Sequence, residues 1–252
     1  MHPSELRKLF SLEDTYWWYV ARRDLVGELL VQYRGWLPAR PLILDIGCGG
    51  GAGLAVFSRL GKAVGLDRSE EALWLSRSRG DFPLICGTAE RLPVANDSLD
   101  VVTALDVLEH VADDAAAVRE MARALKPGGL AIITVPAYQS LWSEHDDALD
   151  HLRRYRAGQV RRLMLRGGMR VLKLSYCITL LLPPIFLFRL AQKLLRPANR
   201  GRPKTAIRPL SPLPNRLLIG LLRLETAWLL RMPLPCGVSV VCVAENPGPQ
   251  DS

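Results

Sequence analysis

Residues 41–51 read PLILDIGCGGG, an apolar run that leads directly into a cluster of glycines. The run over 41–45 has the apolar character of a short buried strand, and a helix is expected after the glycines, over about residues 52–60. Because glycine has no Cβ, the backbone at Gly47, Gly49 and Gly51 can turn sharply and approach a ligand closely. The stretch therefore predicts the first strand–loop–helix unit of an α/β protein.

The rest of the chain alternates between apolar strands and amphipathic helices. Further strands are expected at 63–67, 82–86, 99–105, 130–135, 169–175 and 237–244. Helices are expected over 12–36, 70–79 and 157–166, and from the cap Asp113 to a stop at Gly128-Gly129. This order predicts an α/β fold, in which a doubly wound, mainly parallel sheet is covered by helices on both faces.

The composition bounds the class of protein. A chain of 252 residues with 49% hydrophobic and 23% charged residues fits one large α/β domain, and it excludes a disordered chain or a disulfide-built miniprotein. The five cysteines form no CxxC pair, which favours a reducing compartment and argues against structural zinc. The sequence shows no secretory signal, and its longest uncharged stretch without glycine, 174–188, is shorter than the roughly 20 apolar residues of a spanning helix. A cytoplasmic location is expected.

The excess positive charge is concentrated in one segment. The formal charge is +8, and residues 177–236 hold ten basic residues against the single acid Glu225. This segment is also rich in leucine, with helices expected at 184–196 and 214–231 and a proline-rich linker over 197–214. Apolar faces edged by arginines are typical of helices at an anionic membrane surface. The alternatives are packing on the domain, packing in a homodimer and, least favoured because aromatic residues are few, nucleic-acid binding.

Two carboxylates accompany the glycine cluster. Asp45 ends the first strand, and Asp67 ends the second, where a carboxylate can accept hydrogen bonds from both hydroxyls of a ribose. Gly47-x-Gly49-x-x-Ala52 also satisfies a loose dinucleotide fingerprint, so the loop alone leaves a nicotinamide enzyme open. However, Asp45 would repel a pyrophosphate and suits a cationic ligand. The simplest alternative is that Asp45 caps loop amides and Asp67 caps a helix.

Several ordered motifs now point to one family. Residues 44–51 (LDIGCGGG) with Gly65-Leu-Asp67 resemble the cofactor site of class I S-adenosylmethionine-dependent methyltransferases. The stretches 89–93 (AERLP), 99–111 (LDVVTALDVLEHV) and 125–135 (LKPGGLAIITV) agree with this resemblance. It implies a Rossmann-like, seven-stranded sheet whose last strand is antiparallel. The whole chain, 1–252, would then be a single methyltransferase domain, with a helical cap (1–36), a core (37–176 and 237–246) and a helical insertion (177–236).

The resemblance also implies S-adenosylmethionine as cofactor and assigns roles by position. The loop from Asp45 to Gly51 would hold the methionine part, Asp67 the ribose, and Ala89 with its neighbours the adenine. Arg22, in the N-terminal motif, would pair with the cofactor's carboxylate, or else lie in solvent at the end of a packing helix. Thr88 stands where relatives often have an aspartate. The full predicted set is Arg22, Asp45, Gly47, Cys48, Gly49, Gly51, Asp67, Arg68, Thr88, Ala89, Glu90 and Leu105.

Candidate catalytic residues follow the fourth and fifth strands. Transfer of an activated methyl group needs close alignment of the acceptor and, where a proton must leave, a base. His145 and His151 are the predicted bases, with Tyr155 in the same loop as a third catalytic candidate. The alternative is that these histidines only orient the neighbouring acids and arginines, while His110 caps a helix.

The end of the fourth strand also offers a candidate metal site. The spacing Asp106-x-x-Glu109-His110, with a distant histidine, resembles the ligand set of some magnesium-assisted methyltransferases. Because the Glu-His dipeptide is frequent in plain members of the superfamily, the sequence assigns no metal.

The expected function is methyl transfer from S-adenosylmethionine to a small or lipid-linked acceptor, with possible peripheral attachment to a membrane through 177–236. Residues 16–23 (YWWYVARR) and 145–155 resemble a subset of these enzymes, some of which act near membranes or on polyprenyl-linked glycans. The alternatives are an NAD-type oxidoreductase and a non-catalytic membrane adaptor that retains the fold.

Overall fold

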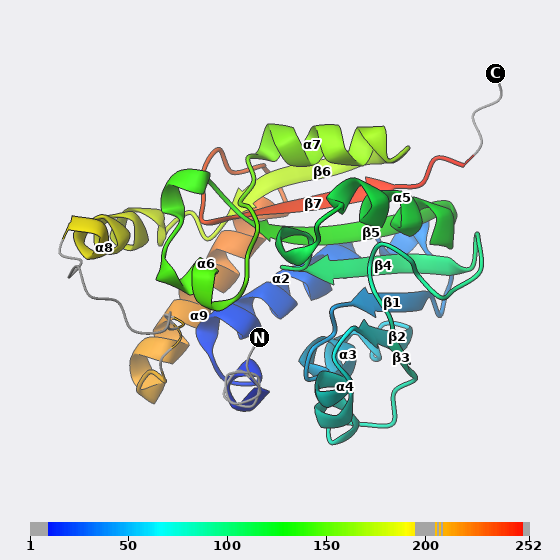
Figure 1. Ribbon diagram of the computed structural model, residues 1–252, viewed down its shortest axis with the longest axis horizontal. Helices are drawn as coiled ribbons and strands as arrows, with labels where there is room; N and C mark the ends of the chain where they lie inside the picture. The colour runs from blue at the N-terminus through cyan, green and yellow to red at the C-terminus, as the bar shows by residue number, and fades with distance from the viewer. Residues whose placement is uncertain (1–9, 195–204, 206, 208, 249–252) are drawn as a thin grey trace.

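The protein is built around one seven-stranded sheet. A computed structural model describes residues 10–194, 205, 207 and 209–248 (Figure 1). The strands are β1 (Leu42–Ile46), β2 (Lys62–Asp67), β3 (Leu84–Cys86), β4 (Leu99–Leu105), β5 (Leu125–Pro136), β6 (Arg170–Cys177) and β7 (Ser239–Glu245). Their order is β3-β2-β1-β4-β5-β7-β6, and β7 runs antiparallel to both of its neighbours. The predicted doubly wound sheet with an antiparallel last strand is therefore confirmed.

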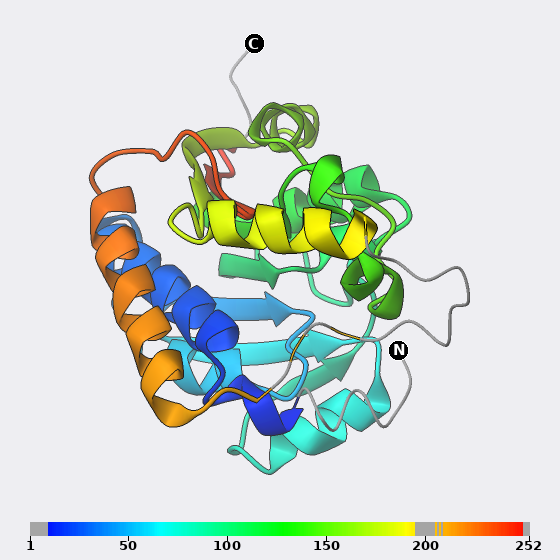
Figure 2. The ribbon, with the colours of Figure 1, turned by 90° about the vertical axis from the view of Figure 1, so that its left-hand side faces the viewer.

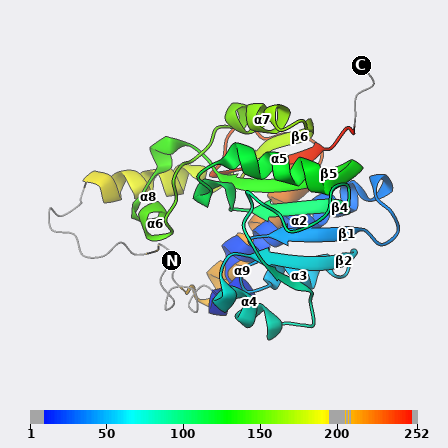
Figure 3. The same ribbon diagram turned by 45° about the vertical axis from the view of Figure 1, so that its right-hand side comes forward.

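Helices cover both faces of the sheet. The helices α5 (Asp114–Ala124) and α7 (Ala157–Arg166) pack on one face, whereas α2 (Trp17–Gln32), α3 (Ala52–Phe57), α4 (Glu70–Arg77) and α9 (Pro212–Leu229) pack on the other (Figure 3). Side chains alternate between the faces along each strand, so Leu44 and Val102 point into the first core and Ile43 and Val101 into the second. Two short helices, α6 (Glu144–Ala148) and α8 (Leu182–Leu194), lie beyond the carboxyl ends of β1 and β4 (Figure 1).

The cap helix expected over 12–36 is interrupted. A short helical segment at 10–13 is followed by a turn, and α2 begins only at Trp17. The side chain of Asn215, from α9, accepts a hydrogen bond from the Trp17 amide (2.9 Å) and donates one to the Thr15 carbonyl (2.7 Å). These bonds replace part of the helical hydrogen bonding at the break, and this long-range contact could not be predicted from the local pattern.

The second insertion helix is part of the core. Figure 2 shows α9 lying alongside α2, where Leu222 and Leu229 join the apolar cluster that includes Val26 and Leu29. Full burial of a leucine or valine side chain contributes about 1.5–3 kcal/mol. The packing alternative is therefore correct for this face of α9, which also carries an ion pair between Arg223 and Asp24 at its edge (2.7 Å).

Some predicted boundaries shift. The helix expected to stop at Gly128-Gly129 ends at Ala124, because the chain from Leu125 is already extended and pairs with Leu99 of β4. Helix α8 begins at Leu182 instead of 184, with the prolines in its first turn, where a missing amide costs nothing. Most of the linker predicted over 197–214 lies outside the described residues, and its last three positions belong to α9.

Within the part of the chain that the structure describes, no helix combines the length and the apolar character needed to cross a bilayer.

The contact between Asn215 and the break before α2 can be tested by substitution. We expect Asn215→Ala to lower the free energy of unfolding by about 1–2 kcal/mol, because two backbone groups lose their partner. Arg216→Ala, at the neighbouring exposed position of α9, is the matched control and should change stability by less than about 0.5 kcal/mol. Urea unfolding measures both, and equal effects of the two variants would show that the contact is not structural.

Candidate active site

A cavity of about 830 Å³ opens at the carboxyl ends of the parallel strands. It lies where the strand order reverses between β1 and β4, the position at which doubly wound sheets bind ligands. Its walls come from the glycine loop, the ends of β2 and β4, the cap helix α2, the loop over 143–154 and the helix α8. This volume is within the range of small-molecule sites.

The glycine loop presents two of its glycines to the cavity. Gly47 (φ +68°) and Gly49 (φ +54°) adopt left-handed backbone conformations and line the wall. A Cβ on Gly47 would lie 2.6 Å from Cγ2 of Val107, so the close approach requires glycine. Cys48 and Gly51, also predicted to contact the cofactor, do not line the cavity. Cys48 is buried below the loop, and Gly51 packs against Ser76 of α4, so both support the loop from behind.

The two predicted carboxylates take different positions. The Asp67 carboxylate lies at the cavity wall, where it accepts hydrogen bonds from the amides of Gly49 (3.0 Å) and Ser69 (2.8 Å). Asp45 does not line the cavity, because its buried carboxyl accepts a hydrogen bond from Thr103 Oγ1 (2.6 Å) beneath the loop. Burial raises the pKa of Asp45 to about 7. The predicted direct contact between Asp45 and a cationic ligand is therefore not what the geometry provides.

The other predicted cofactor residues reach the cavity from three elements. These residues are Arg68 after β2, Thr88, Ala89 and Glu90 after β3, and Leu105 at the end of β4. Leu105 follows Gly47 by 58 positions in the chain, yet both residues line one cavity. The reason is that the parallel strands end at the same edge of the sheet.

Arg22 reaches the cavity from the opposite side, from the cap helix. It forms a largely buried ion pair with Asp106, a residue at φ +55° directly after β4, and Asp106 also accepts a hydrogen bond from Thr134 Oγ1 (3.0 Å). Burial alone would raise the pKa of Asp106, but the Arg22 charge holds it below its usual range. The alternative of a solvated Arg22 is therefore wrong. Its Nε is buried without a hydrogen-bond partner among the described residues, and the residue lines the cavity.

Three histidines line the cavity. His151 is held by the buried Asp146 carboxylate (Nδ1 to Oδ1, 2.9 Å), which also accepts a hydrogen bond from Arg154 Nε (2.7 Å). The His110 and His151 rings meet edge to face, with centroids 4.7 Å apart, and His145 follows at 6.3 Å from His151. Burial lowers the pKa values of His110 and His145 to about 4, so both rings are neutral at pH 7.

Tyr155, the third catalytic candidate, does not reach the cavity. Its ring is buried under α5, and its hydroxyl group hydrogen-bonds the Leu108 carbonyl (3.1 Å) and the Asp114 carboxylate (2.8 Å). Its role is therefore structural. The sequence predicts that Tyr155 lies in the loop after β5. The direction of its side chain depends on an isolated β-bridge between Tyr155 and Ala137, which no local pattern predicts.

The sequence analysis missed several cavity residues. Glu13 accepts a hydrogen bond from the Gly50 amide (3.2 Å), and Tyr19 lies beside Arg22, both from the N-terminal segment that carries the motif 16–23. Arg189 is one of the ten basic residues of 177–236, for which the sequence suggested a place at the edge of an apolar, membrane-facing helix. Instead it points inward, donates to the Leu141 carbonyl and lies 3.7 Å from Asp146. The side chains of Lys193 and Arg196 lie outside the described residues.

The comparisons with known proteins identify a methyltransferase domain in this chain. Residues 44–133 match the family model described as a methyltransferase domain. An uncharacterised 37.1 kDa protein of transposon TN4556 from Streptomyces fradiae is 31% identical over 172 residues, which cover 62% of this chain and 50% of the relative. A ubiquinone biosynthesis O-methyltransferase of Azorhizobium caulinodans is 33% identical over 156 residues, which cover 52% of this chain and 61% of the relative. The chain thus spans about half the length of such relatives.

Among solved structures, a chain of the complex between the Haloferax volcanii Trm112 methyltransferase activator and a methyltransferase is similar in fold. It has a TM-score of 0.62 at 18% identity, over 99% of this chain and 97% of that chain. Residues 44–133 therefore carry a methyltransferase domain, and the chain shares its fold with that solved structure.

The buried carboxyl of Asp45 predicts a distinctive pH dependence of stability. Between its ordinary pKa of 3.8 and its folded value of about 7, the folded chain holds a proton that the unfolded chain has lost. Folding therefore takes up a proton, and this contribution to stability falls as the pH rises, by up to about 1 kcal/mol per pH unit. In Asp45→Asn, whose side-chain oxygen can still accept from Thr103, we expect this loss to disappear.

Urea unfolding of both proteins between pH 4 and pH 7 measures the difference. The variant should gain stability relative to the natural chain as the pH rises. Asp81→Asn, at an exposed carboxylate outside the cavity, is the control. Parallel curves for Asp45→Asn and the natural chain would contradict a neutral, buried Asp45.

Proposed function

We propose that this protein transfers the methyl group of S-adenosylmethionine to a hydroxyl group of a small, lipid-linked acceptor at a membrane surface. One observation carries the proposal: Gly47, Gly49 and Asp67 share a single cavity with His145 and His151. A site for an adenosyl cofactor and candidate bases for an acceptor are thus part of the same chamber. The relatives named as ubiquinone biosynthesis O-methyltransferases support a hydroxyl on a lipid-linked molecule as acceptor.

The chain's own residues fit the cofactor. The Asp67 carboxylate suits the ribose hydroxyls, since it accepts only two amide bonds and a carboxylate offers about four acceptor positions. Ala89 and Leu105 give an apolar wall for the adenine, and Arg22, which also lines the cavity, carries a positive charge that suits the cofactor's carboxylate. When bound, S-adenosylmethionine supplies a methyl group on a sulfonium, and an acceptor lone pair displaces the thioether S-adenosylhomocysteine.

The histidines then serve the acceptor. A hydroxyl acceptor must lose its proton, and a neutral imidazole within reach can take it. His145 and His151 are both at the cavity wall, and Asp146 holds the His151 ring in one orientation through its Nδ1. We assign the base to one of these two residues.

The outer wall of the cavity favours an apolar acceptor. Helix α8 lines the chamber with Ile185 and Phe188, while Leu187 on the same helix is 63% exposed. A lipid-linked molecule could therefore enter along α8 with its polar end first. Arg189 lies beside these apolar residues in the cavity wall and places a positive charge on the side of α8 that faces Asp146.

A second apolar surface on α9 supports attachment to a membrane. Leu213, Leu217, Leu224 and Trp228 recur at i, i+4, i+11 and i+15, which is one face of a helix, and they are between 63% and 72% exposed. We call these four residues the α9 stripe. Three exposed arginines lie on the same helix or directly after it: Arg216, Arg223 and Arg231. Their positive charges would be attracted to the negative headgroups of an anionic bilayer.

The cofactor assignment predicts the effect of losing Asp67. Asp67→Ala should weaken binding of S-adenosylhomocysteine by about 10- to 100-fold, because a charged acceptor for the ribose and two loop amides is lost. Isothermal titration calorimetry measures this, with Asp81→Ala as the control. NADH should not bind. Tight binding of NADH without binding of S-adenosylhomocysteine would instead support the oxidoreductase alternative.

The α9 stripe predicts association with anionic membranes. The full-length protein should float with liposomes that contain phosphatidylglycerol, and less so at high salt, because the arginines contribute through screened charge. The double variant Leu217→Ser, Trp228→Ser should reduce flotation several-fold.

Trp74→Ser is the matched control, since Trp74 is 68% exposed but lies on α4. Flotation of the double variant equal to that of the Trp74→Ser control would contradict the membrane proposal without affecting the cofactor assignment.

A further inference from the structure

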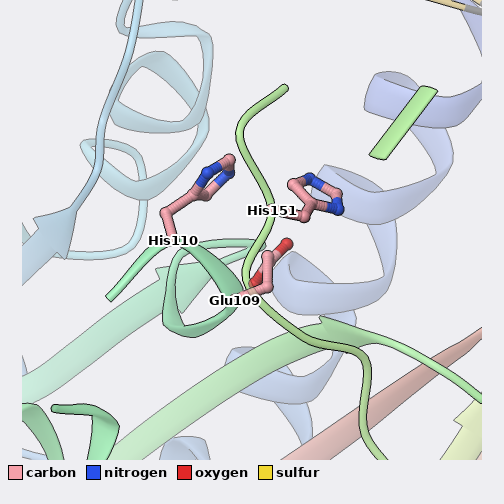
Figure 4. Close-up of side chains that lie close together, drawn as sticks. All are labelled: Glu109, His110 and His151. Atoms are coloured by element: carbon pink, nitrogen blue, oxygen red, sulfur yellow. The ribbon is translucent and has the colours of Figure 1, made fainter. Parts of the chain in front are cut away.

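Three potential metal ligands meet at one point of the cavity wall. The carboxylate of Glu109 and the rings of His110 and His151 each offer one ligand atom, and these atoms all lie within 4.8 Å of one another. Figure 4 shows the two rings next to each other, with the Glu109 carboxylate directed towards His151. All three residues line the cavity described above.

Glu109 is the unexplained member of this group. Its side chain is fully buried, and neither carboxylate oxygen hydrogen-bonds another residue in the described part of the chain. Nearby arginines are engaged elsewhere, because Arg22 pairs with Asp106 and Arg154 with Asp146. Burial raises the pKa of Glu109 well above its usual range, so an ionised Glu109 would need a positive charge beside it, which a bound cation could supply.

His151 is oriented as a metal-binding histidine would be. Its Nδ1 contacts the Asp146 carboxylate at 2.9 Å, and Asp146, being fully buried and paired with Arg154, stays ionised. Such a carboxylate holds the proton on Nδ1 and leaves Nε2 with its lone pair free for a cation. A carboxylate behind a ligating histidine is the usual outer partner in metal sites.

The backbone holds the two halves of the cluster together. Glu109 and His110 belong to the short turn η2 (Leu108–His110), whereas His151 lies 41 residues later in the chain. The Leu152 amide donates a hydrogen bond to the Glu109 carbonyl (2.7 Å), so the residue after His151 is tied directly to Glu109. The cluster is therefore preorganised by main-chain contacts.

We propose that Glu109, His110 and His151 bind a divalent transition-metal ion of the Zn²⁺ or Mn²⁺ type. Two imidazoles and one carboxylate suit such ions better than Mg²⁺ or Ca²⁺, which prefer oxygen ligands. Asp106, the other acid suggested by the sequence spacing, is taken by Arg22 and is not a ligand. Three protein ligands leave coordination positions open towards the cavity, as in catalytic metal sites.

The role of the ion rests on the proposed function. An acceptor hydroxyl on the open position would lose its proton more readily, because the metal stabilises the resulting oxyanion. His151 would then be a ligand, and His145 would remain as the base that takes the proton. Metal binding itself does not depend on the identity of the acceptor.

Direct titration tests the site. The full-length protein, stripped with a chelator and titrated with ZnCl₂ and separately with MnCl₂ in a calorimeter, should bind about one ion per chain. Glu109→Gln and His151→Gln should each weaken binding by about 100-fold or more, since a ligand is lost. His145→Ala is the matched control, because it removes a histidine of the same cavity that lies outside the cluster, and its affinity should stay within about threefold of the natural chain.

Thermal unfolding gives a second measurement. The ion should raise the melting temperature of the natural chain and leave that of Glu109→Gln unchanged, because only the natural chain binds it in the folded state. The proposal is overturned if the natural chain binds neither ion in stoichiometric amount, or if both glutamine variants bind as tightly as it does.

Binding of S-adenosylhomocysteine, measured on the same metal-free samples, distinguishes the two proposals. If the protein binds S-adenosylhomocysteine but no metal ion, only the metal site is rejected. If it binds the metal ion but not S-adenosylhomocysteine, only the proposed function is rejected.

Discussion

The buried ion pair between Arg22 and Asp106 is the interaction on which the site depends. It joins the cap helix α2 to the end of β4, two elements that are 84 residues apart, and so closes the cavity on the side opposite the glycine loop. A buried pair of this kind is expensive to form and more expensive to break, because the remaining charge would be left without a partner. The same pair holds the pKa of Asp106 below its usual range and occupies this carboxylate, which is not part of the cluster of Glu109, His110 and His151.

The insertion before β7 completes the chamber that the sheet begins. One of its helices, α9, buries an apolar face against α2 and thereby supports the helix that carries Arg22. The other, α8, turns Arg189 inward beside Asp146 and supplies apolar side chains to the outer wall. Because apolar groups also remain exposed on both helices, the insertion combines a structural role with a surface suited to a lipid partner.

Most of the fold was predictable from local patterns. Alternating apolar strands and helices predict a parallel sheet. The glycines at 47 and 49 predict the ligand loop because glycine readily adopts their left-handed conformations, and at Gly47 a side chain would also collide with Val107. The position of Asp67 at the cavity was also predictable, because it ends the strand that neighbours the glycine loop. The inward turn of Arg189, the structural role of Tyr155 and the burial of Asp45 were not, because helical spacing or loop position does not say which neighbour a side chain meets.

The sequence by itself predicted the mainly parallel sheet, the glycine loop and the resemblance to methyltransferases, since these follow from the spacing of apolar residues, the placement of glycines and the ordered motifs. Only the tertiary structure decided which residues share the cavity. Glu109, His110 and His151 become neighbours because a main-chain hydrogen bond ties Leu152 to Glu109, and the break before α2 exists because Asn215 reaches it from α9. Such contacts join residues far apart in the chain, so no local pattern records them, and they decide what the site can bind.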